Sequence, residues 1–516
     1  MTQKLTKTQK LIVAIDQGTT SSRAIAFDER GQQQAVAQRE HEQHFPRPGW
    51  VEHDASEIRD NVTAVLAELF EILGDQASAV QGIGITNQRE TVVVWDAATG
   101  EPVAPAIVWQ DARTQRIVDE MEEDGGLDRY REITGLPLAT YFSATKLRWI
   151  LDSDPELQRR ADAGELLAGT MDSWVIWNLT GGTNGGLHVT DVTNASRTLL
   201  MNLRKQEWEP SILADFNIPA SMLPRIVSSS GHIGHISENQ PGAGLPIAGI
   251  LGDQQAALFG QAAFKPGQAK NTYGTGCFVM YNTGTTPARS TKGLLTTVAY
   301  QLDGEEPVYA LEGSIAVAGS LVQWLRDNLK MFDHAPKIEE LASQVEDSGG
   351  CYIVPAFSGL YAPWWQPEAR GVMTGLTRYV TREHIARAVL EATAFQTADV
   401  FDAAEEDVDG QLTELRVDGG MVANNVLMQF QADLLGVDVV RPAVTETTAL
   451  GAAYAAGLAV GVWGSLEEIE QNWQLERTFT RSMEKEKVER KKRIWRKAVH
   501  RSFDWVDEDV QADSGT

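Results

Sequence analysis

Short apolar runs alternate with longer amphipathic segments along most of the chain, and this order predicts an α/β architecture with a largely buried sheet. Apolar runs at 11–15, 24–27 and 35–39 predict three strands near the beginning. A helix is expected from Asp54, because a glutamate stands three residues later as in a capping box, and apolar residues recur at helical spacing through 58–69. This helix is interpreted as structural.

Two further strands are predicted at 80–86 and 91–96. The four residues between them, Asn87–Glu90, are therefore interpreted as a tight hairpin whose side chains are held rigidly between buried elements. Much later, the stretch 449–463 is rich in Ala and Gly and is too short to span a membrane. Such small side chains are typical of a helix that packs closely on a sheet.

The pattern begins again near residue 260, and this repeat predicts how the chain divides. A Gly/Thr-rich turn leads into the second predicted strand, at 24–27, and a similar turn, Asn271–Cys277, leads into an apolar run at 278–281. The weak repeat predicts two related lobes that face each other across a cleft. The expected parts are an N-terminal lobe at 1–258, a C-terminal lobe at 259–500 and an acidic tail at 501–516.

Composition and charge narrow the class of protein. The 516 residues include 42% hydrophobic and 22% charged residues, which is ordinary for a folded enzyme and argues against disorder. The formal net charge of −26 disfavours nucleic acid or an anionic membrane as a partner. Arg outnumbers Lys while acidic residues exceed both together, a balance that suggests a protein adapted to concentrated salt, although many mesophilic enzymes are also acidic.

The two cysteines, Cys277 and Cys351, are too few for a disulfide framework and favour a reducing cytoplasm, although one disulfide stays open. The chain starts with a polar, basic segment, and the apolar run that follows ends at Asp16, which is too short for the core of a signal peptide. We therefore expect a soluble cytoplasmic protein.

The first candidate for chemistry is the turn Ile15–Arg23. Gly18 allows a tight bend and the close approach of an anion, while neighbouring hydroxyl groups add donors to the exposed N–H groups. Asp16, at the end of the strand, is a candidate to hold Mg²⁺ through water. The alternative is an ordinary Ser/Thr-rich hairpin with a surface aspartate.

Two later junctions of a strand and a helix add candidates. Asp253 opens a helix after an apolar strand, either as a helix N-cap or as a carboxylate in the cleft between lobes. Asp418–Gly420 precede a helix that begins near Val426, where backbone amides favour an anion or a nucleotide; the alternative is a Gly-Gly turn that needs positive φ. The chain has neither a G-x-x-x-x-G-K-[ST] loop nor a kinase H-R-D signature.

Five segments in this order resemble the glycerol kinases, a group within the FGGY carbohydrate kinase family, and the resemblance extends from about Leu11 to about Trp463. It implies an α/β fold of two ribonuclease-H-like lobes of the actin and Hsp70 type around a central cleft. It also implies transfer of the ATP γ-phosphoryl group to glycerol with Mg²⁺, giving sn-glycerol 3-phosphate in the first step of glycerol catabolism. The segments are Asp16–Arg23, Ile85–Glu90, Gly252–Gly260, Asn271–Cys277 and Val417–Gly420.

The resemblance also implies roles for individual residues, with Asp253 as the catalytic base. The residues expected at the ATP phosphates are Thr19, Thr20, Ser21 and Arg23, with Asp16 on the magnesium side. The residues expected to line the nucleotide site in the facing lobe are Thr275, Gly319, Gln323, Gly420 and Asn424. The residues expected at glycerol are Thr19, Arg89, Glu90, Tyr141, Asp253 and Gln254, with Trp109 and Phe278 as apolar walls.

One segment departs from the family pattern. Bacterial members bind the inhibitor fructose 1,6-bisphosphate through a Gly-rich loop that ends in Arg, and the corresponding segment here, 228–246, has no Arg. That inhibition is therefore doubtful. His232 and His235 in this polar loop suggest a metal or phosphorylation site, but solvated side chains are the more common explanation. The basic run 485–493 is interleaved with glutamates and is interpreted as a solvated helix face.

Two rival functions stay open at this point. One is an FGGY kinase that acts on a pentulose or a similar polyol, against which Asn87–Glu90 and Tyr141 weigh. The other is a non-metabolic ATPase of the actin and Hsp70 type, against which the pairs Asp253–Gln254 and Arg89–Glu90 weigh. The resemblance suggests a homodimer or a homotetramer.

Overall fold

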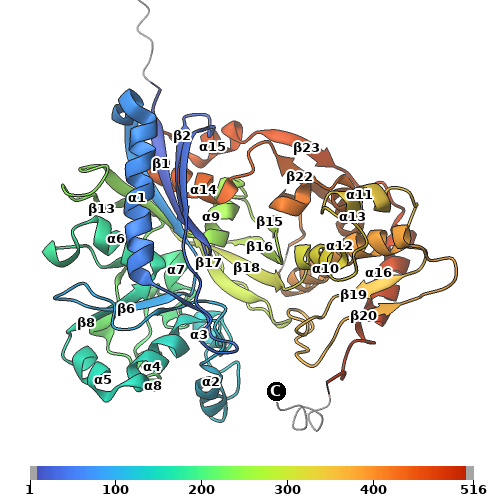
Figure 1. The fold of residues 1–516 in the computed structure, drawn as a ribbon, viewed down its shortest axis with the longest axis horizontal. Helices are drawn as coiled ribbons and strands as arrows, with labels where there is room; N and C mark the ends of the chain where they lie inside the picture. The colour runs from blue at the N-terminus through green and yellow to red at the C-terminus, as the bar shows by residue number, and fades with distance from the viewer. Residues whose placement is uncertain (1–8, 409, 507–516) are drawn as a thin grey trace, which may run out of the picture.

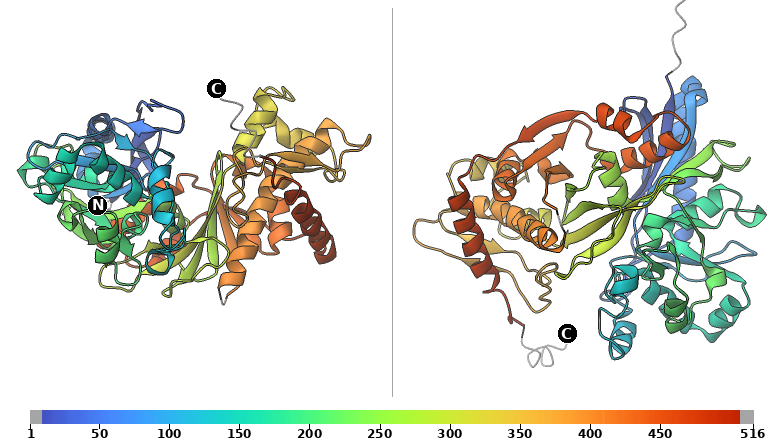
Figure 2. Two further views of the ribbon diagram at one scale, coloured as in Figure 1. Left: turned by 90° about the horizontal axis from the view of Figure 1, so that it is seen from below. Right: turned by 180° about the vertical axis from the view of Figure 1, so that it is seen from behind.

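The computed structural model describes residues 9–408 and 410–506, which form two lobes around two mixed β-sheets (Figure 1). The sheet of the N-terminal lobe has six strands in the order β13-β14-β5-β1-β2-β3, and that of the C-terminal lobe has seven in the order β17-β18-β16-β15-β21-β22-β23. Figure 2 shows the lobes at opposite ends of the molecule. The α/β two-lobed architecture predicted from the sequence is confirmed.

The strands predicted at 11–15, 24–27, 35–39 and 80–86 are present and slightly longer than predicted. β1 pairs antiparallel with β2 and parallel with β5, so the Gly18 turn joins two adjacent strands as a hairpin. The bounds are β1 Leu11–Gln17, β2 Ser21–Asp28, β3 Gln33–Glu40, β5 Val80–Asn87, β13 Ser230–His235 and β14 Pro246–Gly252.

Helix α1, Ala55–Leu73, packs on β2 and β3 with its apolar stripe buried. Asp54 is its N-cap, as predicted, and accepts from the N–H groups of Ser56 and Glu57. In a capping box, the Glu57 carboxylate would accept from the N–H of the N-cap residue. Here it accepts instead from the N–H of Glu42, at 3.3 Å. The glutamate thus ties the start of the helix to the chain that leaves β3.

The prediction of a tight hairpin at Asn87–Glu90 is wrong. β5 already has β1 on one edge and β14 on the other, so no edge remains for the next strand. β6, Val92–Asp96, instead joins a separate four-stranded sheet in the order β4-β7-β6-β8. The connection therefore passes from one sheet to another, and Glu90 adopts a positive φ of 61° there. The other strands of this sheet are β4 Glu52–His53, β7 Ala106–Ile107 and β8 Leu166–Thr170.

The C-terminal lobe repeats the pairing of the first sheet. β15 pairs antiparallel with β16 and parallel with β21, as β1 does with β2 and β5, which confirms the predicted repeat. The strand bounds are β15 Gln268–Tyr273, β16 Cys277–Gly284, β17 Leu295–Tyr300, β18 Val308–Ile315, β21 Glu414–Asp418, β22 Asp438–Pro442 and β23 Leu475–Phe479. The helices packed around them include α10 Gly319–Asp327, α12 Arg382–Asp407, α13 Asn425–Leu435 and α16 Lys485–Val499.

Helix α14, Thr447–Ala459, lies on the sheet of the N-terminal lobe although it follows the strands of the C-terminal lobe. It packs on β1, β5, β14 and helix α9, Asp253–Gly260. A Cβ atom at Gly84 would overlap the carbonyl oxygen of Ala452, so glycine is required for this approach. The predicted close packing of the Ala- and Gly-rich segment is confirmed, whereas the predicted lobe boundary at 258 and 259 falls inside α9 and stays a prediction.

The cysteines, the segment 228–246 and the basic run 485–493 were also interpreted from the sequence. Cys277 and Cys351 are buried free thiols. The segment 228–246, interpreted as a polar loop, includes strand β13, and both of its histidines are exposed. The run 485–493 lies in α16, and most of its charged side chains are solvated as predicted, but Lys491 is buried and donates to Glu391. Among residues 9–408 and 410–506, no helix is both long and apolar enough to cross a membrane. Residues 507–516 of the predicted acidic tail lie outside the described chain.

Candidate active site

The β1–β2 turn is tight, as the sequence predicts, because the N–H of Gly18 donates to the carbonyl of Ser21 at 2.9 Å. Thr19 and Ser21 are partly exposed and Thr20 is exposed, so hydroxyl groups are presented at this turn. Arg23, expected at the ATP phosphates, is held in ion pairs. Its guanidinium pairs with Asp16 and donates to Glu446, 2.7 Å away in the segment before α14.

Asp16 is buried at the end of β1, and burial raises the pKa of its carboxyl group while the Arg23 charge lowers it. Asp253, on α9, is close enough for its negative charge to raise the pKa of Asp16 further. The carboxylates of Asp16 and Asp253 therefore lie near each other although they come from different elements. A cation between them would be favoured, because it would offset both negative charges.

The aromatic residues predicted as walls meet beside the same turn. Trp109 Nε1 donates to Thr19 Oγ1 at 3.0 Å. The ring of Trp109 packs edge-on against Tyr141 and Phe278, with centroid separations of 5.9 and 6.4 Å. Tyr141 belongs to the N-terminal lobe and Phe278 to β16 of the C-terminal lobe, so these side chains line the junction of the two lobes.

A buried network of charges lies next to these rings. Arg89, on the β5–β6 connection, donates to Glu312 with Nη1–Oε2 and Nη2–Oε1 distances of 2.6 and 2.9 Å. Arg197 donates to Glu90 Oε1 at 2.6 Å and to Glu312 Oε1 at 3.2 Å. Arg89 Nε lies 3.1 Å from Asp253 Oδ1. The network therefore connects both lobes to the predicted base.

Opposite charges in this network stabilise the ionised forms of Glu312 and Arg89. Burial opposes ionisation of Glu312, yet Arg197 and Arg89 hold its pKa at about 2. Burial also opposes the charge of Arg89, yet Glu312 and Glu90 raise its pKa well above the usual value. For Glu90, burial outweighs the two arginines and raises the pKa. Glu312 and Arg197 were not predicted as site residues. For Glu312 the available signal is the single charged residue in the segment 308–315, whereas Arg197 lies in a mixed polar segment that gives no such signal.

Asp253 is the first residue of α9 and not its N-cap, which is Gly252, so the alternative interpretation of Asp253 as a cap is wrong. Its Oδ1 atom accepts from the N–H of Gln254 at 2.7 Å and faces Arg89. Its side chain is 33% exposed, whereas that of Arg89 is only 2% exposed. Asp253 therefore presents an accessible carboxylate that is oriented by a buried guanidinium.

The turns predicted to line the nucleotide site also come together. The N–H of Gly319, at the start of α10, donates to the carbonyl of Gly274 at 3.0 Å, beside Thr275. Gly419 has φ 91°, and a Cβ atom there would lie 2.5 Å from the carbonyl oxygen of Tyr273. The positive φ supports the Gly-Gly turn, and the same turn brings Gly420 next to the end of β15.

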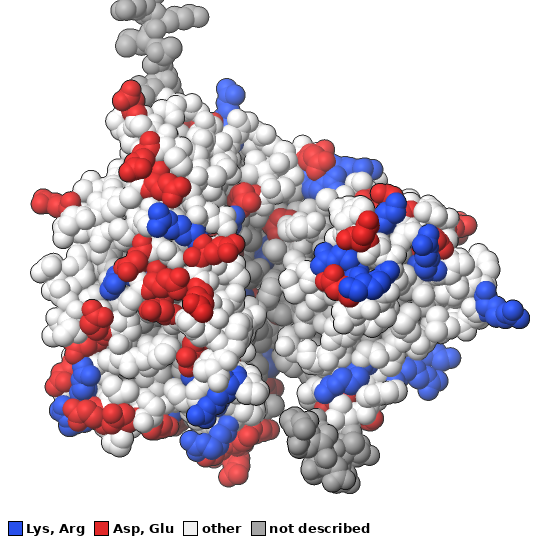
Figure 3. Space-filling view, viewed as in Figure 1, with Lys and Arg blue, Asp and Glu red and all other residues white. Residues whose placement is uncertain are grey.

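The accessibility of the remaining predicted nucleotide residues differs. Thr275, Gln323 and Gly420 are exposed at the surface of these turns and of α10. Asn424 is the N-cap of α13, and its Oδ1 atom accepts from the N–H of Leu427 at 2.9 Å. Its side-chain oxygen is thus committed to the helix. On the face shown in Figure 3, the surface is hollowed between the lobes, and acidic side chains are numerous over the N-terminal lobe.

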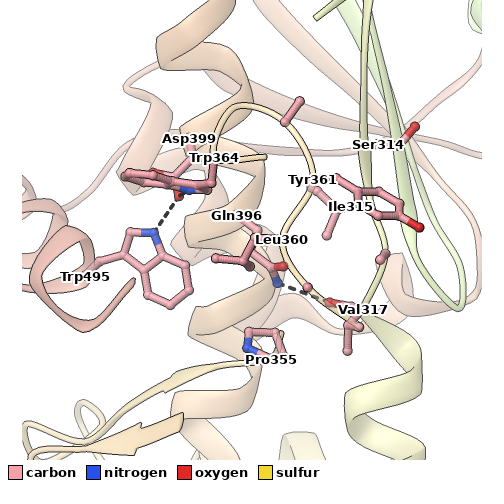
Figure 4. Close-up of a pocket in the computed structure, with 13 residues that line it drawn as sticks. Ser314, Ile315, Val317, Pro355, Leu360, Tyr361, Trp364, Gln396, Asp399 and Trp495 are labelled. Carbon is pink, nitrogen blue, oxygen red and sulfur yellow. Dashed lines mark hydrogen bonds between the residues drawn. The ribbon is translucent and has the colours of Figure 1, made fainter. Parts of the chain in front are cut away.

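A separate cavity lies within the C-terminal lobe, between α12, α16 and the segment 355–364 (Figure 4). The carboxylate of Asp399 accepts from Trp364 Nε1 at 3.0 Å and from Trp495 Nε1 at 2.7 Å there. None of the residues predicted for ATP or the acceptor lines this cavity. It is therefore distinct from the candidate active site.

Comparison with known proteins defines the class. Residues 11–260 match the FGGY family of carbohydrate kinases, N-terminal domain, and residues 269–460 match its C-terminal domain. The chain belongs to the FGGY family of carbohydrate kinases.

Within that family it is similar in sequence to the glycerol kinases of two bacteria. It is 60% identical over 503 residues to the protein of Clavibacter michiganensis subsp. michiganensis, covering 98% of this chain and 100% of the relative. It is 59% identical over 500 residues to that of Pseudarthrobacter chlorophenolicus, covering 97% and 99%.

Solved structures agree with this relationship. The glycerol kinase of Plasmodium falciparum, solved with ADP, superposes with a TM-score of 0.91 at 40% identity over 96% of this chain and 98% of that one. The xylulose kinase of Rhodospirillum rubrum superposes with a TM-score of 0.85 at 26% identity over 95% and 99%. The resemblance to the glycerol kinases noted from the sequence is therefore confirmed.

Proposed function

We propose that the protein transfers the γ-phosphoryl group of ATP to glycerol, giving sn-glycerol 3-phosphate and ADP, as the first step of glycerol catabolism. Curated glycerol kinases about 60% identical to nearly the whole chain support this assignment. The structural observation that carries it is the accessible carboxylate of Asp253, held 3.1 Å from the buried Arg89 beside the aromatic wall and the β1–β2 turn.

The acceptor site suits a small polyol. Arg89, Glu90 and Tyr141 present charged and phenolic groups, and Gln254 presents an amide, while Trp109 and Phe278 supply apolar walls. Such a site pairs each substrate hydroxyl with a polar atom. It disfavours an analogue that lacks a hydroxyl, because a buried polar atom of the protein is then left without a partner.

Asp253 is proposed to act as the general base. As the attacking hydroxyl oxygen of glycerol forms a bond to the γ-phosphorus, its proton passes to the Asp253 carboxylate. The bond between that phosphorus and the bridging oxygen of ADP breaks, and ADP leaves with the electron pair. Because the transition state of phosphoryl transfer is loose, positioning and neutralisation of charge supply most of the rate, and the base adds to them.

The ATP phosphates are proposed to contact Thr19, Thr20 and Ser21 at the β1–β2 turn, with Arg23 close behind. The nucleotide would lie against Thr275, Gly319, Gln323, Gly420 and Asn424. Asp16 fits a role in holding Mg²⁺, because its buried carboxylate is near that of Asp253 and a cation would offset both charges. Mg²⁺ would supply charge neutralisation on the phosphates, and it commonly takes its other ligands from phosphates and water.

Other properties remain proposals. We propose that the protein is a homodimer or a homotetramer in the cytoplasm. Insensitivity to fructose 1,6-bisphosphate is proposed because the segment 228–246 contains no arginine. Light scattering on the purified protein and inhibition assays with the bisphosphate would test the assembly and the regulation.

The decisive experiment measures ADP release from Mg-ATP with and without glycerol and identifies the product with glycerol-3-phosphate dehydrogenase. Glycerol-dependent turnover that gives this product is expected. Equal ADP release with and without glycerol would favour an ATPase of the actin and Hsp70 type. No stimulation by glycerol together with stimulation by a pentulose would favour another FGGY kinase.

A further inference from the structure

A fully buried lysine that the sequence did not single out lies beside the predicted acceptor residues. Lys270, on β15, has no exposed surface. Its Nζ atom donates to Gln254 Oε1 at 2.5 Å and to Thr272 Oγ1 at 2.9 Å. Gln254 follows Asp253 in α9, so the lysine acts on the residue adjacent to the proposed base.

The charge of Lys270 is maintained by its surroundings. Burial lowers the pKa of its ammonium group to about 8, while the negative charges of Asp418, Glu312 and Asp253 act in the opposite direction and Arg89 adds to the lowering. The group is therefore mostly cationic at neutral pH. A cation that is buried against an amide oxygen forms a stronger hydrogen bond than a neutral donor does.

This contact determines how the Gln254 amide is oriented. A lysine ammonium group has three donors and no acceptor, so the side-chain atom that faces it must be the amide oxygen of Gln254. The amide nitrogen, Nε2, then points away from Lys270 and donates to no other residue of the described chain. Gln254 is only 9% exposed, so little solvent reaches its side chain.

We infer that Lys270 is a positioning residue that fixes the Gln254 amide with Nε2 as a donor to a hydroxyl of the acceptor. The inference rests on the proposed function and deepens it. A hydroxyl that accepts from Gln254 has its own proton free to be donated elsewhere. The amide would thereby engage a lone pair of that hydroxyl, and Lys270, which has no exposed surface, would act only through Gln254.

A double-mutant cycle of Lys270→Met and Gln254→Ala tests this coupling. Methionine keeps the length of the stem but removes the donors, so the amide is free to turn over. We expect each single variant to raise the KM for glycerol roughly tenfold, the value of one hydrogen bond, with a smaller change in kcat. The double variant should be no worse than Gln254→Ala alone, because both changes remove the same contact. The KM for ATP should stay close to that of the wild type.

Additive effects of the two substitutions on the KM for glycerol would overturn the inference, as would an equal rise in the KM for ATP. Lys265→Met is the matched control, because Lys265 is an exposed lysine that pairs with Glu470 on the surface. It should leave both KM values unchanged. Thermal unfolding checks that each variant is folded.

Gln254→Glu provides a second test that leaves Lys270 in place. A carboxylate satisfies the lysine but has no N–H to offer, so the KM for glycerol should rise as much as in Gln254→Ala. A KM close to that of the wild type would mean that an oxygen faces the acceptor, which contradicts the inference. Failure of the proposed function is a separate result, because it would appear as a wild-type protein without glycerol-dependent turnover.

Discussion

Arg89 and Glu312 form a bidentate ion pair across the junction of the two lobes, although 223 positions separate them in the chain. Both side chains are almost completely buried. Arg89 also lies 3.1 Å from Asp253, so Glu312 determines the position of the guanidinium that orients the proposed base. A second arginine, Arg197, approaches the same glutamate at 3.2 Å. Glu312 thus contacts both buried cations, and Glu90 is the other buried carboxylate that pairs with Arg197.

Glu312→Gln should lower the free energy of unfolding by about 3–5 kcal/mol, because it leaves two buried arginines with too little compensating charge. Denaturant unfolding followed by fluorescence measures the change. Glu156→Gln is the control, because Glu156 pairs with Arg159 on the surface, where solvent screens the pair and its loss changes the stability little. A loss below about 1 kcal/mol in Glu312→Gln would contradict the importance of this pair.

Asp253→Asn should keep the fold and lower kcat about 10²- to 10⁴-fold, because an amide cannot accept the proton of the attacking hydroxyl. The Arg89 contact can persist, since the amide oxygen still accepts a hydrogen bond. Steady-state kinetics with saturating glycerol and Mg-ATP measure the loss, and a Tm near that of the wild type provides the control. Near-normal turnover would rule out Asp253 as the base.

Much of the fold could be predicted because the informative patterns are local. The apolar runs of β1, β2 and β3, the Asp54 cap and the Ala- and Gly-rich helix α14 each follow from a few neighbouring residues. The repeat of the hairpin at β15 and β16 predicted two lobes for the same reason. The hairpin predicted at Asn87–Glu90 was wrong, because both edges of β5 are occupied by strands that are distant in the sequence, and local residues do not reveal this.

At the candidate site, only residues that belong to a motif or follow from the resemblance could be predicted. The rings of Trp109, Tyr141 and Phe278 do meet, as the resemblance implied. Glu312 and Lys270 were missed because a single charged residue in a strand does not identify the partner that lies elsewhere in the chain. The roles that the resemblance implies for Arg23 and Asn424 at the nucleotide stay predictions. Their contacts with Glu446 and with the start of α13 could not be predicted, because no motif at either residue identifies these partners.

The net charge of −26 leads to a prediction about salt. Repulsion among surface carboxylates opposes the compact state, and ions screen it over a distance that shrinks from about 10 Å at 0.1 M to about 3 Å at 1 M. We therefore propose adaptation to high salt and expect both the Tm and the activity to rise from dilute buffer to molar KCl. Equal osmolality of sucrose serves as the control. Full activity in dilute buffer with no gain from KCl would remove this hypothesis.

Asp399 provides a pH-dependent contribution to stability away from the active site. Burial raises the pKa of its carboxyl group to about 7, although hydrogen bonds from Trp495 and Trp364 oppose this shift. These three residues join α12, α16 and the segment before residue 365 around the cavity in Figure 4. Nearby Asp402 raises the pKa further, and Arg496 lowers it.

The sign of the effect follows from proton linkage. The folded protein holds a proton on Asp399 between pH 4 and 7 that the unfolded chain releases, so this group favours folding at low pH and its contribution is lost as the pH rises toward 7. In Asp399→Asn the side chain stays neutral at every pH. Its stability relative to the wild type should therefore increase by about 2–3 kcal/mol between pH 5 and pH 8. Denaturant unfolding of both proteins across this range measures the difference, and a difference that is constant with pH would show that Asp399 is ionised in the folded protein throughout.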